Sequence, residues 1–101
     1  MTTADALGSI MRSTWDRITP ELRGIAYLQT DEALRVRFIY EHDPDEDTVE
    51  LVSFAETECI ADFWQTLEVT YVAEGLTITE PRLLHDDERW AYLRYEAPME
   101  A

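Results

Sequence analysis

The stretch Ala33-Leu-Arg-Val-Arg-Phe-Ile-Tyr-Glu41 alternates large apolar side chains with mostly charged ones. Successive side chains of a β-strand point to opposite faces of the sheet, so this pattern divides the stretch into two faces. The first face carries apolar and aromatic side chains, namely Leu34, Val36, Phe38 and Tyr40. The opposite face carries Arg35, Arg37, Ile39 and Glu41. The sequence therefore predicts a strand over Ala33–Glu41 with one face in a core.

The residues before this strand predict another strand and a helix. The pattern over Gly24–Gln29 also predicts a strand, with Ile25, Tyr27 and Gln29 on one face. The polar link Thr30-Asp31-Glu32 that follows suits a hairpin turn. Apolar side chains at spacings of three and four predict a helix over Thr3–Ile18. Pro20 stops that helix, because the residue before a proline disfavours the helical conformation. The apolar stripe of the helix comprises Leu7, Ile10, Met11, Thr14, Trp15 and Ile18.

The residues after the strand predict a loop and a second helix. His42–Thr48 is a loop by composition, and the helix that follows ends near Phe63. Asp47, with Glu50 three residues later, follows the logic of a capping box at the start of this helix. A strand over Val49–Ala55 is the competing interpretation, since Val and Phe favour sheets. In the helical interpretation the buried stripe is Val52, Ala55, Cys59 and Phe63, flanked by Thr48 and Glu56.

The C-terminal third predicts two more strands, over Leu67–Ala73 and Arg89–Ala97. Between them, Leu76–Leu84 either extends a strand or forms an irregular connection around Pro81. Arg94 is expected to pair with a carboxylate of the second helix, and Arg35 and Arg37 to support the sheet in the same way. The side chains expected to serve the sheet are Leu67, Val69, Tyr71, Ala73, Trp90, Tyr92 and Tyr95.

The order of these elements is α-β-β-α-β-β. Such an order is typical of an α+β fold in which helices pack on one side of an antiparallel sheet. We therefore expect residues 1–101 to form one α+β domain, with an antiparallel sheet of about four strands and two helices packed on it.

The charge of the chain limits the classes of partner that it can bind. Its net charge is −14, and the stretch from Phe38 to Pro81 contains twelve acidic residues and no Lys or Arg. Nucleic acid and anionic membranes bind proteins through Lys and Arg and repel carboxylates, so direct binding of this chain to either is not expected. A basic protein surface is the natural complement of such a charge. The alternative is that the acidity serves only solubility, or reflects adaptation to high salt.

Cysteine content and hydropathy bear on the cellular compartment. Cys59 is the only cysteine, so no intramolecular disulfide is expected, and its apolar neighbours predict a buried, inert thiol. The N-terminus lacks the basic and apolar regions of a signal peptide, and no apolar run reaches the length of a membrane span. The expected location is the cytoplasm.

The candidate metal and catalytic patterns are weak. Asp43, Asp45 and Asp47 match the first positions of a calcium loop, but Thr48 and Phe54 stand where that loop needs glycine and glutamate. The two histidines have no metal-ligand spacing, and the serines lack the signature of an activated nucleophile. We therefore expect no metal, no cofactor and no enzymatic activity.

The second helix carries the strongest candidate binding surface. Four carboxylates and one aromatic ring recur every four residues along it and would form one surface ridge, here called the acidic ridge: Glu46, Glu50, Phe54, Glu58 and Asp62. Phe54 either folds inward at the edge of the buried stripe or stands outward as an interface anchor ringed by charge. The neighbouring loop carboxylates of Asp43, Asp45 and Asp47 extend this candidate partner-binding surface.

Three segments carry a family resemblance. They are Thr57-Glu-Cys-Ile-Ala-Asp-Phe63, the acidic stretch Tyr40-Glu-His-Asp-Pro-Asp-Glu-Asp47 and Trp90-Ala-Tyr-Leu-Arg-Tyr-Glu96. From about Arg23 to Glu96 the chain resembles small bacterial immunity proteins of contact-dependent growth inhibition and related polymorphic toxin systems. The resemblance implies a cytoplasmic, non-catalytic α+β domain that binds and neutralises a toxin, and it implies no catalytic residue.

Two function hypotheses follow. In the first, this acidic protein binds and blocks a basic partner, a nuclease toxin domain, by steric and electrostatic occlusion. In the second, it is a cytoplasmic α+β domain, monomeric or a homodimer through its sheet or its aromatic last strand, whose acidity serves solubility only.

Overall fold

The computed structural model of the chain describes residues 3–63 and 65–96, and the alternating stretch forms a central strand, β2 (Ala33–Tyr40). As its alternation predicts, one face is in the core, where Leu34, Val36, Phe38 and Tyr40 are each at most 1% exposed. β1 (Leu22–Gln29) pairs with it in antiparallel register, with Ile25 opposite Phe38 and Tyr27 opposite Val36. The hairpin turn is closed by Thr30, whose backbone N–H donates to the Ala33 carbonyl at 2.9 Å.

The sheet has the strand order β3-β2-β1-β4, and it is mixed, not antiparallel throughout. β3 (Glu68–Gly75) runs parallel to β2, while β1 pairs antiparallel with both β2 and β4 (Arg89–Leu93). The prediction of an antiparallel sheet was therefore wrong for one of the three strand pairs. The α+β class and the element order were correct.

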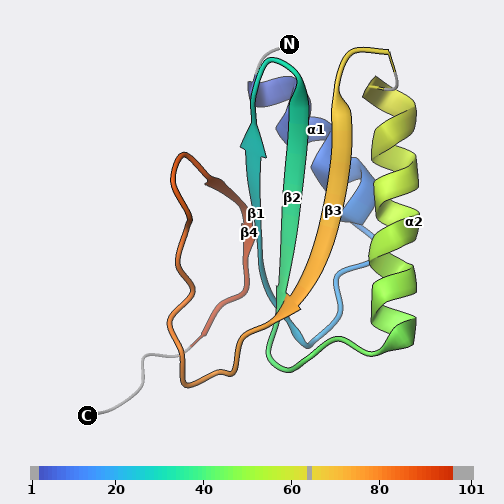
Figure 1. Cartoon of the computed structure of the whole chain (residues 1–101). Coiled ribbons are helices and arrows are strands. Elements are labelled where there is room, and N and C mark those ends of the chain that lie inside the picture. Colours follow the sequence, from blue (N-terminus) through green and yellow to red (C-terminus); the bar gives the residue numbers. More distant parts are fainter. Residues whose placement is uncertain (1–2, 64, 97–101) are drawn as a thin grey trace.

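The parallel pair follows from the length of the intervening helix. α2 (Glu46–Phe63) has 18 residues and spans about 27 Å at 1.5 Å per residue. An eight-residue strand such as β2 spans about the same distance, at roughly 3.3 Å per residue. α2 therefore returns the chain to the end of the sheet at which β2 began, and β3 starts there in the same direction as β2 (Figure 1).

The first helix, α1 (Thr3–Thr14), ends four residues before the predicted Ile18. In a continuing helix the Arg17 N–H would donate to the Ser13 carbonyl, but here it donates to Thr14 O at 2.8 Å and closes a tight turn. The Ser13 carbonyl instead accepts a hydrogen bond from the Arg17 guanidinium, also at 2.8 Å. Consequently Trp15 and Ile18 leave the apolar stripe and are 79% and 37% exposed.

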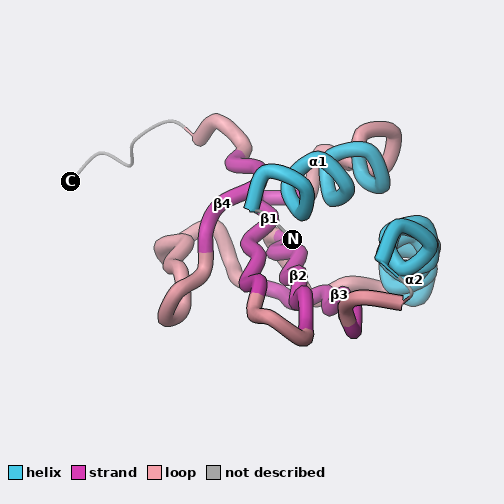
Figure 2. The backbone as a smooth tube through the Cα atoms, turned by 90° about the horizontal axis from the view of Figure 1, so that it is seen from above, coloured by secondary structure: helices cyan, strands magenta, loops and turns pink. Residues whose placement is uncertain are grey.

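The segment between β3 and β4 is an irregular connection, the second of the two alternatives for this stretch. It lies on the face of the sheet that the helices leave free (Figure 2). β4 ends at Leu93, earlier than the predicted Ala97, which is outside the described residues. After Leu93 the Arg94 and Glu96 side chains turn into an ion-pair cluster with Arg23.

The core lies between the sheet and the two helices, which pack on the same face (Figure 2). α1 contributes Ala6 and Ile10, while β3 contributes Val69 and Tyr71. The Tyr71 and Phe38 rings pack with centroids 5.5 Å apart. The predicted buried stripe of α2 is confirmed and comprises Val52, Ala55, Cys59 and Phe63.

Candidate functional site

α2 exposes a long face along one side of the molecule (Figure 1). Because its buried stripe faces the sheet, the acidic ridge lies away from the core. Phe54 is 54% exposed, which supports the outward alternative for this ring and not the inward one. Val49 is 50% exposed on the same helix, one turn before Ser53 and Phe54. Apolar surface thus stands among the carboxylates of the acidic ridge.

The start of α2 is capped by Asp45 and not by Asp47. The Asp45 carboxylate accepts a hydrogen bond from the Thr48 backbone N–H at 2.8 Å. This hydrogen bond, with a further one from the Thr48 hydroxyl, lowers the pKa of the Asp45 carboxyl. The predicted capping box was misplaced by two residues, because Asp47 already lies within the helix that begins at Glu46.

The first turns of α2 border an open groove of about 620 Å³. In the part of the chain that the structure describes, Glu46, Asp47 and Glu50 make no ion pair, so their charges face solvent. The groove is lined by Pro44, Asp45, Glu46, Asp47, Val49, Glu50 and Ser53. Apolar and acidic groups therefore share one accessible surface at this end of the helix.

The other half of the acidic ridge is held by arginines at the end of α1. Arg17 donates two hydrogen bonds to the Glu58 carboxylate, each at 3.0 Å. Arg12 pairs with Asp62, which also accepts a hydrogen bond from the Ser9 hydroxyl at 2.5 Å. The acidic ridge thus has a half that is paired within the molecule and a half, Glu46 to Phe54, that is free of ion pairs among the described residues.

The acidic loop before α2 is also partly engaged. Glu41 pairs with Arg94 at 2.9 Å, so the predicted partner of Arg94 on the second helix was wrong. Arg94 directly follows β4, which is the edge strand at the opposite end of the strand order from β3. Asp43 packs against Gly75, where an added Cβ would lie 2.7 Å from the Asp43 backbone nitrogen. Glycine at this position therefore allows the loop to approach the end of β3.

Arginines gather around the Glu96 carboxylate. Arg23, which is 2% exposed, donates to it from Nε at 2.9 Å and from Nη2 at 3.0 Å. Arg94 donates at 2.9 Å, and Arg82 Nε lies 3.3 Å away. Hydrogen bonds from Arg23 lower the pKa of the Glu96 carboxyl to about 2, and the other two arginines reinforce the effect. Loss of Glu96 would destabilise the fold, since it would leave the buried Arg23 guanidinium without its anionic partner.

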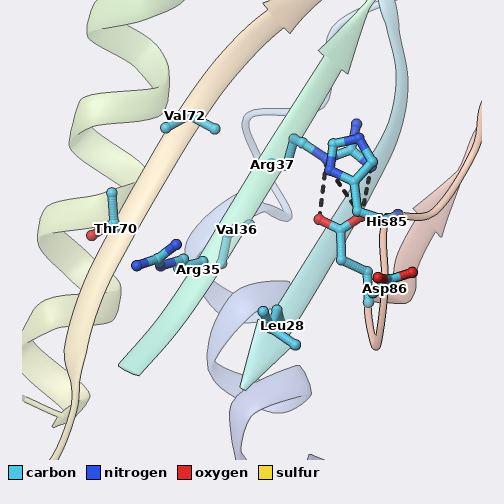
Figure 3. Close-up of a pocket in the computed structure, with 9 residues that line it drawn as sticks. Leu28, Arg35, Val36, Arg37, Thr70, Val72, His85 and Asp86 are labelled. Carbon is cyan, nitrogen blue, oxygen red and sulfur yellow. Dashed lines mark hydrogen bonds and ion pairs between the residues drawn. The ribbon is translucent and has the colours of Figure 1, made fainter. Parts of the chain in front are cut away.

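The helix-free face of the sheet carries a pocket of about 410 Å³ next to the irregular connection (Figure 3). Arg37 holds that connection through Glu88 at 2.7 Å and the Leu83 carbonyl at 3.0 Å, and it pairs with Glu74 at 2.5 Å. Arg37 therefore supports the sheet as predicted, but its carboxylate partners come from β3 and the connection and not from the second helix. The pocket is lined by Leu28, Arg35, Val36, Arg37, Thr70, Val72, His85, Asp86 and Glu88.

Cys59 lies in a buried polar contact between the helices and β3, as expected of an inert thiol. Its sulfur is 3.3 Å from the Ser9 hydroxyl, and burial raises the pKa of the thiol. Nearby, Ser13 and Tyr71 share a hydrogen bond at 2.8 Å, and burial raises the pKa of the Tyr71 phenol as well. A raised pKa keeps the thiol protonated at neutral pH and unsuited to nucleophilic attack.

Across residues 3–63 and 65–96, no group of three or more His, Cys, Asp or Glu side chains is placed to hold a metal ion. Within the same residues, no helix combines the length and the apolar character that crossing a membrane requires.

Sequence reasoning missed Trp15 as a surface residue. The spacing of apolar residues placed it in the buried stripe of α1, but the residue is 79% exposed beyond the end of that helix. The available signal was Pro20, which limits how far a helix can continue and leaves the length of the preceding turn undetermined.

Comparison with known proteins places this geometry in a family. No match was found among curated proteins. A family model described as MafI2 immunity protein matches residues 3–96. The match spans both helices and all four strands, and it agrees with the resemblance to small immunity proteins of polymorphic toxin systems. The chain therefore belongs to the MafI2 immunity protein family, a family of proteins that neutralise toxins.

Proposed function

We propose that this chain neutralises a basic toxin domain, a nuclease, by covering its nucleic-acid-binding surface with the outward face of α2. The observation that carries the proposal is the position of Phe54, which is 54% exposed on an ordered helix among carboxylates. An aromatic ring with a charged rim is the usual composition of an interface centre. The loop carboxylates of Asp43, Asp45 and Asp47 extend this surface toward the partner.

The charge supports a partner that normally binds phosphate. A nuclease must attract nucleic acid with Lys and Arg, and the same residues attract carboxylates. In this mechanism Glu46 and Glu50 occupy positions that phosphates would take, and Phe54 fills an apolar recess between them. Attraction between opposite charges accelerates the encounter, while steric cover blocks the substrate.

The pairing within the acidic ridge decides which carboxylates to test. Glu58 and Asp62 already bond to Arg17 and Arg12, so replacing them would also disturb the contact between α1 and α2. Glu46 and Glu50 are exposed and have no ion pair among the described residues, so replacing them breaks no ion pair between α1 and α2.

The test uses the cognate toxin domain, which we expect to find encoded near the gene of this chain. We expect Glu46→Lys with Glu50→Lys to lower the association rate constant about tenfold at low salt, because steering depends on charge at the contact surface. The difference from wild type should shrink at high salt, where charges are screened. Stopped-flow or biolayer measurements over a salt series provide the rate constants.

The matched control carries the same change of net charge at a distant position. Asp31 and Glu32 are exposed in the hairpin turn between β1 and β2, so Asp31→Lys with Glu32→Lys alters the total charge equally. If both double variants associate at the same rate, net charge alone matters and the outward face of α2 is not the contact surface.

The nuclease assignment has its own measurement. The toxin domain should degrade DNA or RNA alone and stop doing so when this chain is added in equimolar amount. A toxin domain that binds this chain but cleaves neither nucleic acid would make the nuclease assignment wrong and leave the immunity function in place.

A further inference from the structure

Trp15 is an aromatic ring presented to solvent on a fixed piece of backbone. It follows the last residue of α1, and its side chain is 79% exposed. The turn that holds it is closed by the hydrogen bond from Arg17 N–H to Thr14 O at 2.8 Å. The Thr14 hydroxyl adds a bond to the Ile10 carbonyl at 2.8 Å. An exposed tryptophan therefore stands on an ordered turn, so little conformational entropy would be lost when a partner covers it.

The same turn is tied to α2 at the middle of the acidic ridge. Arg17, two residues after Trp15, donates two hydrogen bonds to Glu58 at 3.0 Å. Phe54 precedes Glu58 by about one helical turn and is 54% exposed. The Arg17–Glu58 ion pair therefore joins the segment that carries Trp15 to the turn of α2 that follows Phe54.

The charges around Trp15 favour a cationic partner. Asp16 beside it has a side chain that is 69% exposed, and the Arg17 charge is already taken by Glu58 and Asp16. The face of a tryptophan ring attracts Lys and Arg by cation–π interaction, and nearby carboxylates add to that attraction. A second copy of this chain, with the same large negative charge, is repelled at long range.

We propose that Trp15 is a second anchor of the toxin-binding surface, which extends from the outward face of α2 onto the end of α1. This inference rests on the proposed function. The occupant is a Lys or Arg side chain of the basic toxin domain, stacked on the indole beside the exposed Asp16 carboxylate, which Arg17 approaches only loosely, at 3.5 Å. Tryptophan is among the residue types most enriched at energetic centres of interfaces, whereas single exposed aliphatic side chains are common on any surface.

The decisive variant is Trp15→Ala, measured against the cognate toxin domain. We expect the dissociation constant to rise about tenfold or more, mainly through faster dissociation. Because the ring is largely exposed, the melting temperature and circular dichroism spectrum should stay close to those of wild type. Trp15→Phe keeps a weaker aromatic face and should recover part of the affinity.

Tyr95→Ala is the matched control, because Tyr95 is an aromatic residue that is 85% exposed. It lies just after β4, the edge strand at the other end of the sheet from β3. Tyr95→Ala should leave the dissociation constant within about twofold of wild type, as expected for a residue outside the interface. Equal dissociation constants for wild type and Trp15→Ala would overturn the inference while the proposed function stands. A toxin domain that fails to bind wild type would overturn both.

A second copy of this chain is the other possible occupant of the surface around Trp15, and light scattering on the wild-type chain tests for it. A monomer that stays monomeric in Trp15→Ala agrees with a toxin contact at this residue. A homodimer that dissociates in Trp15→Ala would assign the indole to contact between two copies and overturn the inference.

Discussion

Three arginine side chains converge on Glu96, although the chain as a whole carries a large excess of carboxylates. They come from β1, from the irregular connection and from the end of β4, so one carboxylate joins segments that are far apart in the sequence. The planar guanidinium explains why arginine suits this place, since it donates several hydrogen bonds in fixed directions. Arg23 Nη1 also donates to the Leu76 and Thr77 carbonyls, each at 3.0 Å.

The lowered pKa of Glu96 predicts a dependence of stability on pH. A carboxyl group with a lower pKa in the folded chain than in the unfolded chain stabilises the fold above its unfolded value. That contribution is lost as pH falls through the folded value. For Glu96 the ordinary value is 4.5 and the folded value is about 2. We therefore expect the free energy of unfolding to fall as pH decreases between these values, measured by urea denaturation at each pH.

Two variants show whether Glu96 causes this fall. Glu96→Gln should be less stable than wild type at neutral pH and should have a flatter profile at acid pH, because it has lost the titrating group. The pKa of Glu88 is also lowered by Arg37 despite its burial, and that of Asp45 by its hydrogen bonds with Thr48, so both groups contribute to the slope that remains. Glu32→Gln, in the exposed hairpin turn, should keep the wild-type profile. An unchanged acid profile in Glu96→Gln would contradict the assignment.

At the scale of the element, α2 serves two purposes through two sides of one helix. Its apolar side chains pack on the sheet, while its acidic ridge faces α1 and solvent. The sequence was sufficient to identify the buried stripe, because residues three and four positions apart lie on the same face of a helix. It was insufficient for the pairing of Glu58 and Asp62, because Arg17 and Arg12 lie more than forty positions away along the chain.

The cap of α2 gives a prediction at this scale. Asp45→Ala should lower the melting temperature by a few degrees, because it leaves the Thr48 backbone N–H without its carboxylate acceptor. Asp45→Asn, which can still accept that hydrogen bond, should recover most of the loss. Asp47→Ala is the matched control, because it removes an equal charge from the first turn of α2. A larger loss in Asp47→Ala than in Asp45→Ala would restore the cap that the sequence predicted.

At the scale of the whole molecule, the net charge of −14 works against the compact state. Raising the NaCl concentration from about 10 mM to 150 mM shortens the Debye length from roughly 30 Å to 8 Å. We expect the melting temperature to rise over this range, since repulsion between exposed carboxylates is screened more than the partly buried arginine pairs. Asp31→Lys with Glu32→Lys should respond less to salt than wild type. A melting temperature that falls with added salt would mean that the ion pairs outweigh the repulsion.

The sequence by itself predicted the elements, their order and most residues of the core, with Trp15 and Ile18 as exceptions, because periods of two and of three to four are local properties of the chain. It also determined the acidity, whereas the outward position of Phe54 in the acidic ridge was settled by the structure. Only the tertiary structure decided that β3 runs parallel to β2, that Glu96 gathers three arginines and that Trp15 faces solvent. These features depend on which distant segments of the chain lie side by side and on which side chain donates to each unpaired carbonyl or carboxylate. No local sequence pattern encodes these long-range choices.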